Sequence, residues 1–301
     1  MLPFARVAII GLGLIGSSVA RAVRERMPTV RLTGHDASAE VRAIADALGL
    51  VDDVADTPGA AVTDADLVIL CVPVRAMGAV AAEIAADLPA EAVVSDVGSC
   101  KAEVTAALAE ALPGATVIPA HPVAGTERSG PEAGFASLFA GRWCIVTPPD
   151  GADLVAAERV AEFWRRLGSQ VETMAPDHHD RVLAVTSHLP HLIAYTIVGT
   201  ASDLGEVTSS EVIKFSAGGF RDFTRIAASD PTMWRDVFLS NKEAVLEMLQ
   251  RFSEDLSQLQ RAIRWGDGDA LFEHFTKTRA IRRSIVEQGQ DDAAPDFGRR
   301  H

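Results

Sequence analysis

The chain has 301 residues, of which 48% are hydrophobic and 23% are charged, and its formal net charge is −13. The length favours two domains, and the composition is typical of a globular protein with a full hydrophobic core. The negative charge argues against nucleic acid and anionic membranes as partners, and any anionic substrate would need a local positive site. Three widely spaced cysteines without a CxxC motif favour a reducing, cytoplasmic setting, and the N-terminal residues lack the pattern of a signal peptide.

The first elements in the chain predict a dinucleotide-binding turn. An apolar strand, Arg6–Ile10, runs into the pattern G-x-G-x-x-G and then into a helical pattern. Gly11 allows the tight turn, Gly13 removes the Cβ that would strike the phosphates, and Gly16 lets the helix pack on its strand. The helix N-terminus offers N–H groups and the positive end of its dipole to the pyrophosphate.

The second predicted strand, Arg31–Gly34, identifies the dinucleotide. It leads to Asp36, twenty residues after Gly16, where a carboxylate is expected to meet the adenine ribose hydroxyls. The carboxylate repels a 2′-phosphate and the next two residues supply no arginine to bind one, so NAD is favoured over NADP. The predicted cofactor-binding residues are Gly11, Gly13, Leu14, Ile15, Gly16, Asp36, Val72 and Pro73.

Short apolar runs continue to alternate with alanine-rich helical patterns up to about residue 175. This alternation predicts βαβ units and therefore a doubly wound α/β domain over residues 1–175. Helices are expected at Val74–Ala86 and Lys101–Leu112. The expected later strands are Leu67–Val72, Ala92–Asp96, Thr116–Ala120, Cys144–Thr147 and Val171–Met174.

After residue 175 the pattern predicts an all-helical domain over residues 176–290, followed by a polar tail over 291–301. Long helices are expected at Asp177–Gly199, Pro231–Trp265 and Asp269–Gln288. Ser229-Asp230-Pro231 predicts the start of the second of these, with a capping side chain and a proline in the first turn. The helical domain is expected to close the substrate cleft and to form a homodimer.

One segment of the helical half, Val182–Val198, is apolar enough to be mistaken for a membrane span. Pro190 and two histidines near its middle would make a lone helix in a bilayer costly. We therefore expect a helix buried on nearly all sides within the second domain or a dimer, and no membrane association.

Two loops after predicted strands carry candidate catalytic residues, one over residues 96–101 and one over 121–130. His121 has the right chemistry for a general base near neutral pH, although a histidine in this position is also compatible with a structural role. Ser99 is compatible with catalysis and with capping the helix that begins near Lys101.

The helical half contains four histidines near its start and one glycine-led loop. His188 and His191 lie three apart on one helical face, whereas His178 and His179 are interpreted as solvated polar residues. The sequence offers no set of ligands for zinc, so no metal is expected. The polar segment 218–225 is predicted to be a loop whose arginine either grips a carboxylate or pairs with Asp222.

Five segments together resemble the prephenate and arogenate dehydrogenases, a family of tyrosine biosynthesis. They are GLGLIGSS at 11–18, DVGSCK at 96–101, HPVAGTERSG at 121–130, SHLPH at 187–191 and GGFRDFTRIAASDPTMW at 218–234. The resemblance implies a Rossmann-type domain followed by a helical dimerisation domain, with NAD as the cofactor and a small molecule as the substrate.

The same resemblance implies roles for individual residues. His121 matches the histidine that hydrogen-bonds the C4 hydroxyl of the substrate ring, and Ser99 matches the serine that assists it. His191 and Arg225 match side chains that hold the substrate, the arginine through a carboxylate. Residues expected to line the same pocket are Thr126, Glu127 and Asp222.

The expected reaction is oxidative decarboxylation of prephenate, in which a hydride leaves C4 while His121 accepts the hydroxyl proton. Arogenate, or both substrates, remains an alternative, since Glu127 or Asp222 would suit its ammonium group. A hydroxy-acid or imine oxidoreductase would not explain SHLPH together with the 218–225 segment. A dinucleotide-sensing regulator would be expected to have lost catalytic residues that this chain retains.

Overall fold

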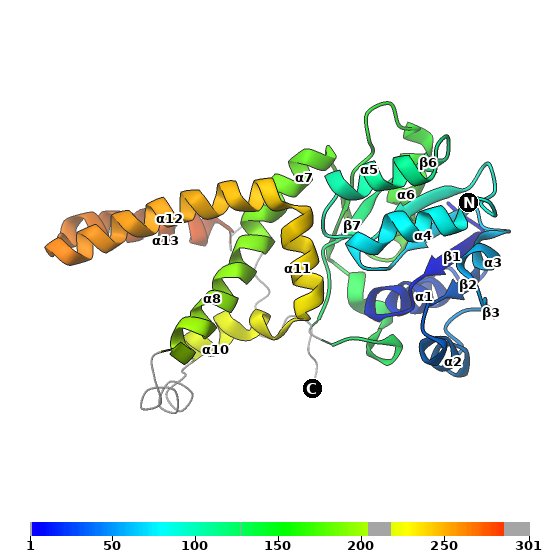
Figure 1. The fold of residues 1–301 in the computed structure, drawn as a ribbon, viewed down its shortest axis with the longest axis horizontal. Coiled ribbons are helices and arrows are strands. Elements are labelled where there is room, and N and C mark those ends of the chain that lie inside the picture. Colours follow the sequence, from blue (N-terminus) through cyan, green and yellow to red (C-terminus); the bar gives the residue numbers. More distant parts are fainter. Residues whose placement is uncertain (1, 127, 204–217, 286–301) are drawn as a thin grey trace. The chain divides into compact units, whose positions relative to one another are not determined.

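The computed structural model describes residues 2–126, 128–203 and 218–285 (Figure 1). Within the described residues the chain divides into two compact units, Met1–Val245 and Leu246–His301. The boundary between the two units therefore lies inside the long helix Lys242–Trp265. The change of pattern in the sequence lies earlier, near residue 175. The first unit contains all the strands of the described chain and the helices up to α11.

A six-stranded parallel sheet forms the centre of the first unit, with strand order β3-β2-β1-β4-β5-β6. This order reverses direction at β1, as in doubly wound dinucleotide-binding folds. The strands are β1 (Arg6–Ile10), β2 (Arg31–His35), β3 (Asp53–Val54), β4 (Leu67–Leu70), β5 (Val93–Asp96) and β6 (Thr116–Val117). The prediction of an N-terminal Rossmann-type domain is confirmed.

Both faces of this sheet are covered because consecutive side chains of a strand point to opposite sides. On β1, Val7 and Ile9 belong to one apolar cluster, which includes Trp164, and Ala8 and Ile10 belong to the other. The helices of this part are α1 (Leu14–Arg26), α2 (Ala39–Ala47), α3 (Pro58–Val62), α4 (Met77–Ile84), α5 (Ala102–Ala111) and α6 (Leu154–Arg166). The 3₁₀ turns are η1 (Val74–Ala76), η2 (Pro131–Ala133) and η3 (Ala136–Phe139).

The predicted strand Thr116–Ala120 is wrong, because the structure divides this segment between two sheets. Its first residues form β6, and its last residue opens β7 (Ala120–Pro122) in a separate three-stranded sheet with order β7-β8-β9. The other strands are β8 (Trp143–Val146), antiparallel to β7, and β9 (Gln170–Thr173), parallel to β8. Pro119 lies between β6 and β7 and has no N–H to donate. The hydrogen bonding of β6 to its sheet therefore cannot continue through this residue.

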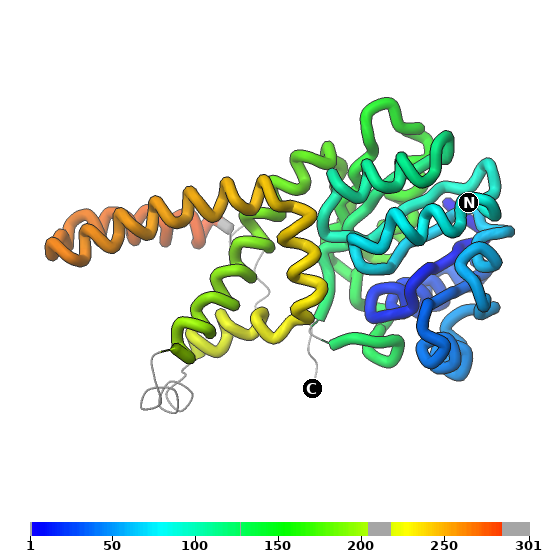
Figure 2. The backbone as a smooth tube through the Cα atoms, viewed as in Figure 1, coloured from blue at the N-terminus to red at the C-terminus, as the bar shows by residue number. Residues whose placement is uncertain are grey.

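One helical stretch of 28 residues, Pro176–Asp203, follows β9 without a break in the tube of Figure 2. It consists of α7 (Pro176–Leu183), a π-helical turn η4 (Ala184–His188) and α8 (Leu189–Asp203). The ring of Pro190 would clash with the carbonyl of Thr186 in a regular α-helix, and the wider π turn directly before it removes this conflict.

Among the described residues this stretch is the one helix long and apolar enough to cross a membrane, by length and composition alone. The chain buries 22% of the most apolar window. The expectation of burial on nearly all sides is therefore not met within one chain, since much of α8 is exposed.

The remaining helices correct two sequence predictions. The segment 218–225 is not a loop, because its first seven residues form α10 (Gly218–Thr224) and the turn η5 (Arg225–Ala228) follows. The predicted helix Pro231–Trp265 is two helices, α11 (Pro231–Ser240) and α12 (Lys242–Trp265), which meet at Asn241. Asp230 caps α11 through the N–H of Met233, as predicted.

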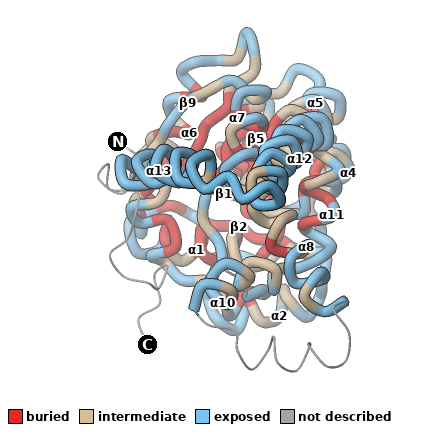
Figure 3. Tube along the Cα trace, turned by 90° about the vertical axis from the view of Figure 1, so that its left-hand side faces the viewer, coloured by how far each residue is buried: buried red, intermediate tan, exposed pale blue. Residues whose placement is uncertain are grey.

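The second unit consists of most of α12 and of α13 (Gly268–Ile285). In Figure 3 these two helices are exposed over most of their length, whereas the central strands β1, β4 and β5 of the first unit are buried almost throughout. Exposed apolar side chains on them are Leu246, Leu256, Ile263, Trp265, Phe272, Phe275 and Ile281. The predicted tail over 291–301 lies outside the described residues.

Candidate active site

The glycine-rich turn joins β1 to α1 with the geometry that the sequence predicts. Gly11 has a φ of +98°, and its N–H donates to the carbonyl of His35 at 2.8 Å. A Cβ at this position would lie 2.5 Å from the carbonyl oxygen of Cys71. Both observations restrict the position to glycine.

The other two glycines have different reasons to be there. A Cβ on Gly16 would lie 1.9 Å from the carbonyl oxygen of Gly11, so the helix can approach the turn only without a side chain. A Cβ on Gly13 would meet no heavy atom within 4 Å, and Gly13 gives the N-terminus of α1 no side-chain cap. This combination of open space and uncapped N–H groups fits a bound pyrophosphate.

Asp36 follows β2 and lies against the same turn. Its Oδ2 accepts the N–H of Leu12 at 2.8 Å, and its Oδ1 accepts the N–H of Ser38 at 2.9 Å. The carboxylate therefore lies beside the glycine-rich turn and retains lone pairs for ribose hydroxyls. Sequence reasoning missed Arg42, whose guanidinium donates to the carbonyls of Asp36 and Ala37 at 2.7 and 3.3 Å.

The remaining predicted cofactor residues border this turn. Leu14 and Ile15 open α1 and are half-buried. Val72 and Pro73 follow the carboxyl end of β4, and the nearest side-chain atom to a Cβ on Gly11 would be Cγ1 of Val72, at 3.1 Å. The structure thus brings the predicted cofactor set together at the carboxyl ends of β1, β2 and β4, where such folds bind dinucleotides.

A buried ion pair fixes the start of β7 against the end of β5. The side chains of Lys101 and Asp96 are fully buried and paired. The ammonium group of Lys101 also donates to the carbonyl of Ala120 at 2.8 Å, and Asp96 accepts the N–H groups of Ala120 and Gly98 at 3.3 and 2.8 Å. These bonds set the position of His121, the next residue of β7.

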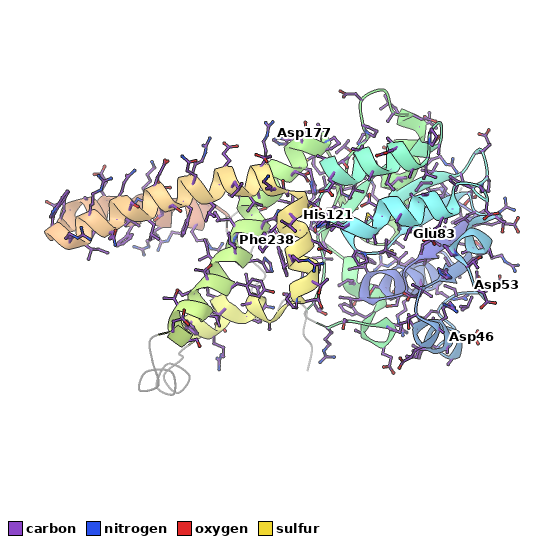
Figure 4. All side chains as sticks on the ribbon, in the orientation of Figure 1. Asp46, Asp53, Glu83, His121, Asp177 and Phe238 are labelled. Carbon is purple, nitrogen blue, oxygen red and sulfur yellow. The ribbon has the colours of Figure 1, made fainter. Side chains whose placement is uncertain are left out.

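His121 is buried and its ring is hydrogen-bonded to the helical half of the first unit. Its Nδ1 lies 2.8 Å from Nε2 of His179, and Nδ1 of His179 lies 2.8 Å from Oδ1 of Asp180. Figure 4 shows His121 on the side of the α/β part next to α7 and α11. The interpretation of His179 as a solvated residue is wrong, because its side chain is fully buried between these two partners.

The carboxylate of Asp180, and not Ser99, caps α5. Asp180 accepts the N–H groups of Lys101 and Ala102 at 2.8 and 2.9 Å, which are the first donors of that helix. The helix has no cap from its own flanking side chain, so the capping role predicted as one option for Ser99 is wrong. A residue 78 positions further along the chain supplies the cap instead.

Burial and neighbouring charges keep the imidazoles of the site neutral. Burial, followed by His179, Lys101 and His188, lowers the pKa of His121 well below its ordinary value of 6.5. Burial also lowers the pKa of His179, although the hydrogen bond to Asp180 opposes the shift. A neutral imidazole is the form that accepts a proton, so His121 is suited to act as a base.

His188 and His191 occupy the end of the π turn and the first turn of α8. His188 is fully buried, its Nδ1 lies 3.1 Å from Nδ2 of Asn241, and burial lowers its pKa to about 4. His191 donates from Nδ1 to the carbonyl of Ser187 at 2.9 Å. Its ring stacks on Trp234 of α11, with centroids 3.6 Å apart.

Electrostatic coupling connects these imidazoles to the remaining predicted residues. His188 lowers the pKa of His121, His191 lowers the pKa of His188, and Arg225 lowers the pKa of His191, in each case in addition to the larger effect of burial. The backbone of Ser99 interacts with His188. His121, Ser99, His191 and Arg225 are thus linked through successive neighbours.

The structure does not bring all of the expected pocket residues to this group. Thr126 is exposed, and its hydroxyl accepts the N–H of Arg128 at 3.2 Å. Asp222 is exposed on α10, with Oδ1 3.9 Å from Nε of Arg221. Glu127 lies outside the described residues. In the described part of the chain, no group of three or more His, Cys, Asp or Glu residues has an arrangement that could hold a metal ion.

Sequence reasoning missed the polar residues that support His121. They are His179, Asp180, His188, Lys101, Asp96 and Asn241. One signal was present, since His-His-Asp at 178–180 opens an otherwise apolar helix. His179 lies four residues before the buried Leu183 and therefore on the same face of the helix. This spacing places His179, and not His178, inside.

Known proteins are similar to this one over most of the chain. A family model described as prephenate dehydrogenase, nucleotide-binding domain, matches residues 19–173, and one described as prephenate dehydrogenase, dimerization domain, matches residues 175–277. The chain is 46% identical to the cyclohexadienyl dehydrogenase of Zymomonas mobilis, over 95% of this chain and 97% of that protein. It is 34% identical to the prephenate dehydrogenase of Bacillus subtilis, over 97% of this chain and 78% of that one.

A solved structure has the same fold over nearly its whole length. It is the crystal structure of prephenate dehydrogenase from A. aeolicus in complex with hydroxyphenyl propionate and NAD+. The TM-score is 0.87 at 34% sequence identity, and the match covers 95% of this chain and 98% of that chain.

Two glycine substitutions are expected to separate folding from dinucleotide binding. Gly16→Ala should lower Tm, because overpacking against the Gly11 carbonyl costs about 1–3 kcal/mol. Gly13→Ala should leave Tm near that of the unchanged protein, since its φ of −68° suits alanine and its Cβ meets nothing. It should weaken NAD binding by about tenfold, because the methyl group takes the space of a phosphate.

Thermal unfolding and calorimetric titration with NAD measure both effects. Unchanged NAD affinity in the folded Gly13→Ala protein would contradict the assignment of this turn.

Proposed function

Because the chain belongs to the prephenate dehydrogenase family, we propose that it catalyses the NAD-dependent oxidative decarboxylation of prephenate to 4-hydroxyphenylpyruvate. The observation that carries this proposal is the buried, neutral His121, which is bonded on Nδ1 to His179. It is placed at the carboxyl end of β5 because the N–H of the preceding residue, Ala120, donates to the carboxylate of Asp96. Its other ring nitrogen, Nε2, remains for a substrate hydroxyl.

The expected chemistry needs a base that can also return its proton. Bound NAD would supply the hydride acceptor for C4 of the substrate. His121 accepts the C4 hydroxyl proton on Nε2, and the electron pair of the O–H bond forms the ring carbonyl. The C1–carboxylate bond then breaks, its electron pair makes the ring aromatic, and His121 returns the proton to the phenolate oxygen. The residues of the chain mainly orient the substrate and move this one proton.

The dianionic substrate needs positive groups against a net charge of −13. The guanidinium of Arg225, which lies close enough to His191 to lower the pKa of that ring, supplies donors of the kind that hold a carboxylate. Asp96 and Asp180, the carboxylates near His121, are already occupied by hydrogen bonds from Lys101, Gly98 and the N-terminus of α5. This electrostatic balance supports an anionic side arm and therefore prephenate.

A second candidate function is oxidation of arogenate, alone or beside prephenate. The 46% identity to a cyclohexadienyl dehydrogenase supports it. The ammonium group of arogenate would need an acidic neighbour. Asp222, one of the two carboxylates considered for this role, is exposed and lies near Arg221.

The reaction and the role of His121 are tested together by following NADH absorbance with prephenate and arogenate, each with NAD and with NADP. Prephenate with NAD should give the highest kcat/KM. His121→Asn should lower kcat about 10²–10⁴-fold with little change in the KM for prephenate, because it removes the base and keeps a polar side chain. An Asn variant with unchanged kcat would exclude His121 as the base.

The pH profile has a predicted sign. The lowered pKa of His121 means that the base is neutral, and therefore active, above that pKa and is lost only as the pH falls through it. The pH profile of kcat/KM reports the pKa values of catalytic groups in the free enzyme. As the pH is lowered, kcat/KM should therefore stay level through the ordinary histidine pKa of 6.5 and decline only at lower pH.

Arg225 is expected to bind substrate charge, and α10 offers a matched control. Arg225→Ala should raise the KM for prephenate about 10- to 100-fold, since a charge-assisted hydrogen bond contributes about 1.5–3 kcal/mol. Arg221→Ala removes another exposed arginine and should leave KM unchanged. Equal KM values for the two variants would show that Arg225 does not clamp a carboxylate.

We also propose a homodimer formed through the helical domain, in the cytoplasm. The match to a dimerization domain over residues 175–277 and the exposed apolar residues of α12 and α13 support the dimer. The three free cysteines suit a reducing compartment.

Light scattering after size exclusion should give a mass of about twice 31.9 kDa. The double variant Trp265→Glu, Phe272→Glu should shift the protein towards the monomer, because each of these side chains is 75% exposed in the single chain. Leu154→Glu changes an equally exposed residue of α6 and should leave the mass unchanged. A monomeric unchanged protein would rule out the dimer.

A further inference from the structure

A buried chain of hydrogen bonds runs from Asp180 through His179 to His121. The two bonds are both 2.8 Å long, and they connect the start of α7 to β7. The two imidazole rings meet edge to face, with centroids 5.1 Å apart and planes at 67°. Ring nitrogens of histidine donate or accept according to the position of one proton, so the direction of each bond has to be derived.

Asp180 determines which atoms donate in these two hydrogen bonds. Its carboxylate accepts the N–H groups of Lys101 and Ala102 in addition to the bond with His179. Burial raises the pKa of Asp180, but the hydrogen bonds from His179, Ala102 and Lys101 outweigh it, and the pKa lies below its ordinary value. An ionised carboxylate can only accept, so Nδ1 of His179 carries a proton and donates it to Oδ1.

The charge of His179 decides the second bond. Burial and the ammonium group of Lys101 disfavour a positive ring, whereas Asp180 and Asp96 favour one, and the pKa of His179 is lowered on balance. His121 faces the ring of His179, and its own pKa is lowered by burial, His179, Lys101 and His188. His179 is therefore neutral, with its single proton on Nδ1. Its Nε2 has only a lone pair, and the proton between the two rings must belong to Nδ1 of His121.

We propose that His179 and Asp180 are positioning residues that hold His121 in the tautomer with the proton on Nδ1 and the lone pair on Nε2. This inference rests on the proposed function, in which Nε2 of His121 accepts the substrate hydroxyl proton. In a catalytic triad a carboxylate bonds directly to the catalytic histidine and fixes its tautomer. Here one further imidazole, His179, lies between the carboxylate and that histidine. In the opposite tautomer, Nε2 of His121 would carry a proton and could not act as the base.

The same pair of hydrogen bonds, Asp180–His179 and His179–His121, also accommodates the positive charge that forms on His121 during turnover. When Nε2 of His121 gains the hydroxyl proton, the ring becomes positive and its Nδ1–H still donates to Nε2 of His179. Asp180 stabilises this charge through the polarised ring of His179. The proton returns from Nε2 to the substrate oxygen when the ring becomes aromatic, so the chain ends each cycle in its starting state.

Three variants test the role of His179 in turnover. His179→Phe removes both ring nitrogens and should lower kcat about 10²–10⁴-fold. The KM for NAD should stay near its usual value, because His179 is bonded to His121 and Asp180 and is not one of the residues assigned to the dinucleotide. His179→Gln places an amide oxygen where it can accept from Nδ1 of His121, and it should restore most of the lost kcat. His178→Phe, on the exposed side of α7, is the matched control and should leave kcat unchanged.

The tautomer itself is read without turnover, from ¹⁵N NMR of ring-labelled histidines in the full chain, with His121 assigned by its absence in His121→Asn. The proposal expects the proton on Nδ1 of His121 in the unchanged protein and in His179→Gln, and a shift towards Nε2 in His179→Phe. A proton on Nε2 in the unchanged protein, or a full kcat in folded His179→Phe, would overturn it. An inactive unchanged protein with the proton on Nδ1 would instead count against the proposed reaction alone.

Discussion

The carboxylate of Asp180 accepts three hydrogen bonds, and they come from two parts of the chain that are far apart in sequence. Two of the donors are the first N–H groups of α5, in the α/β part, and the third is the ring of His179 on α7. Helix α5 has no cap of its own, so the helical half supplies it. The same contact that completes α5 therefore also aligns the ring that meets His121. Asn241 adds to this junction by donating to the carbonyl of Asp180 at 2.7 Å.

Burial and positive charge act together at this junction. Lys101 is fully buried with Asp96, and its ammonium group discourages protonation of His121 and His179. An overall negative chain can thus contain a local region in which imidazoles are neutral and a cationic group is close by. An imidazole in such an environment keeps its lone pair, which is the form that accepts a proton.

The sequence predicted the fold well where the signal was local. The glycine turn, Asp36 and the alternation of β1, β2, β4 and β5 depend on neighbouring residues, and the structure places them as expected. The break between β6 and β7 was missed because Pro119 interrupts an otherwise suitable run, and the helix of residues 218–224 was missed because two glycines open it. The relay behind His121 was missed for another reason. Its partner lies 58 positions away, and although the helical spacing from Leu183 marks His179 as the inward histidine, no local pattern indicates that its ring meets His121.

The π-helical turn at Ala184–His188 determines which stripe of α8 faces the rest of the site. Such a turn holds one residue more than an α-helical turn, so every later side chain is rotated by about 100° about the helix axis. With that rotation His191, in the first turn of α8, stacks on Trp234. The rotational position of α8 about its own axis is thus set by a single additional residue beside Pro190. Homologues that gained or lost one amino acid there would present a different set of side chains on an otherwise identical scaffold.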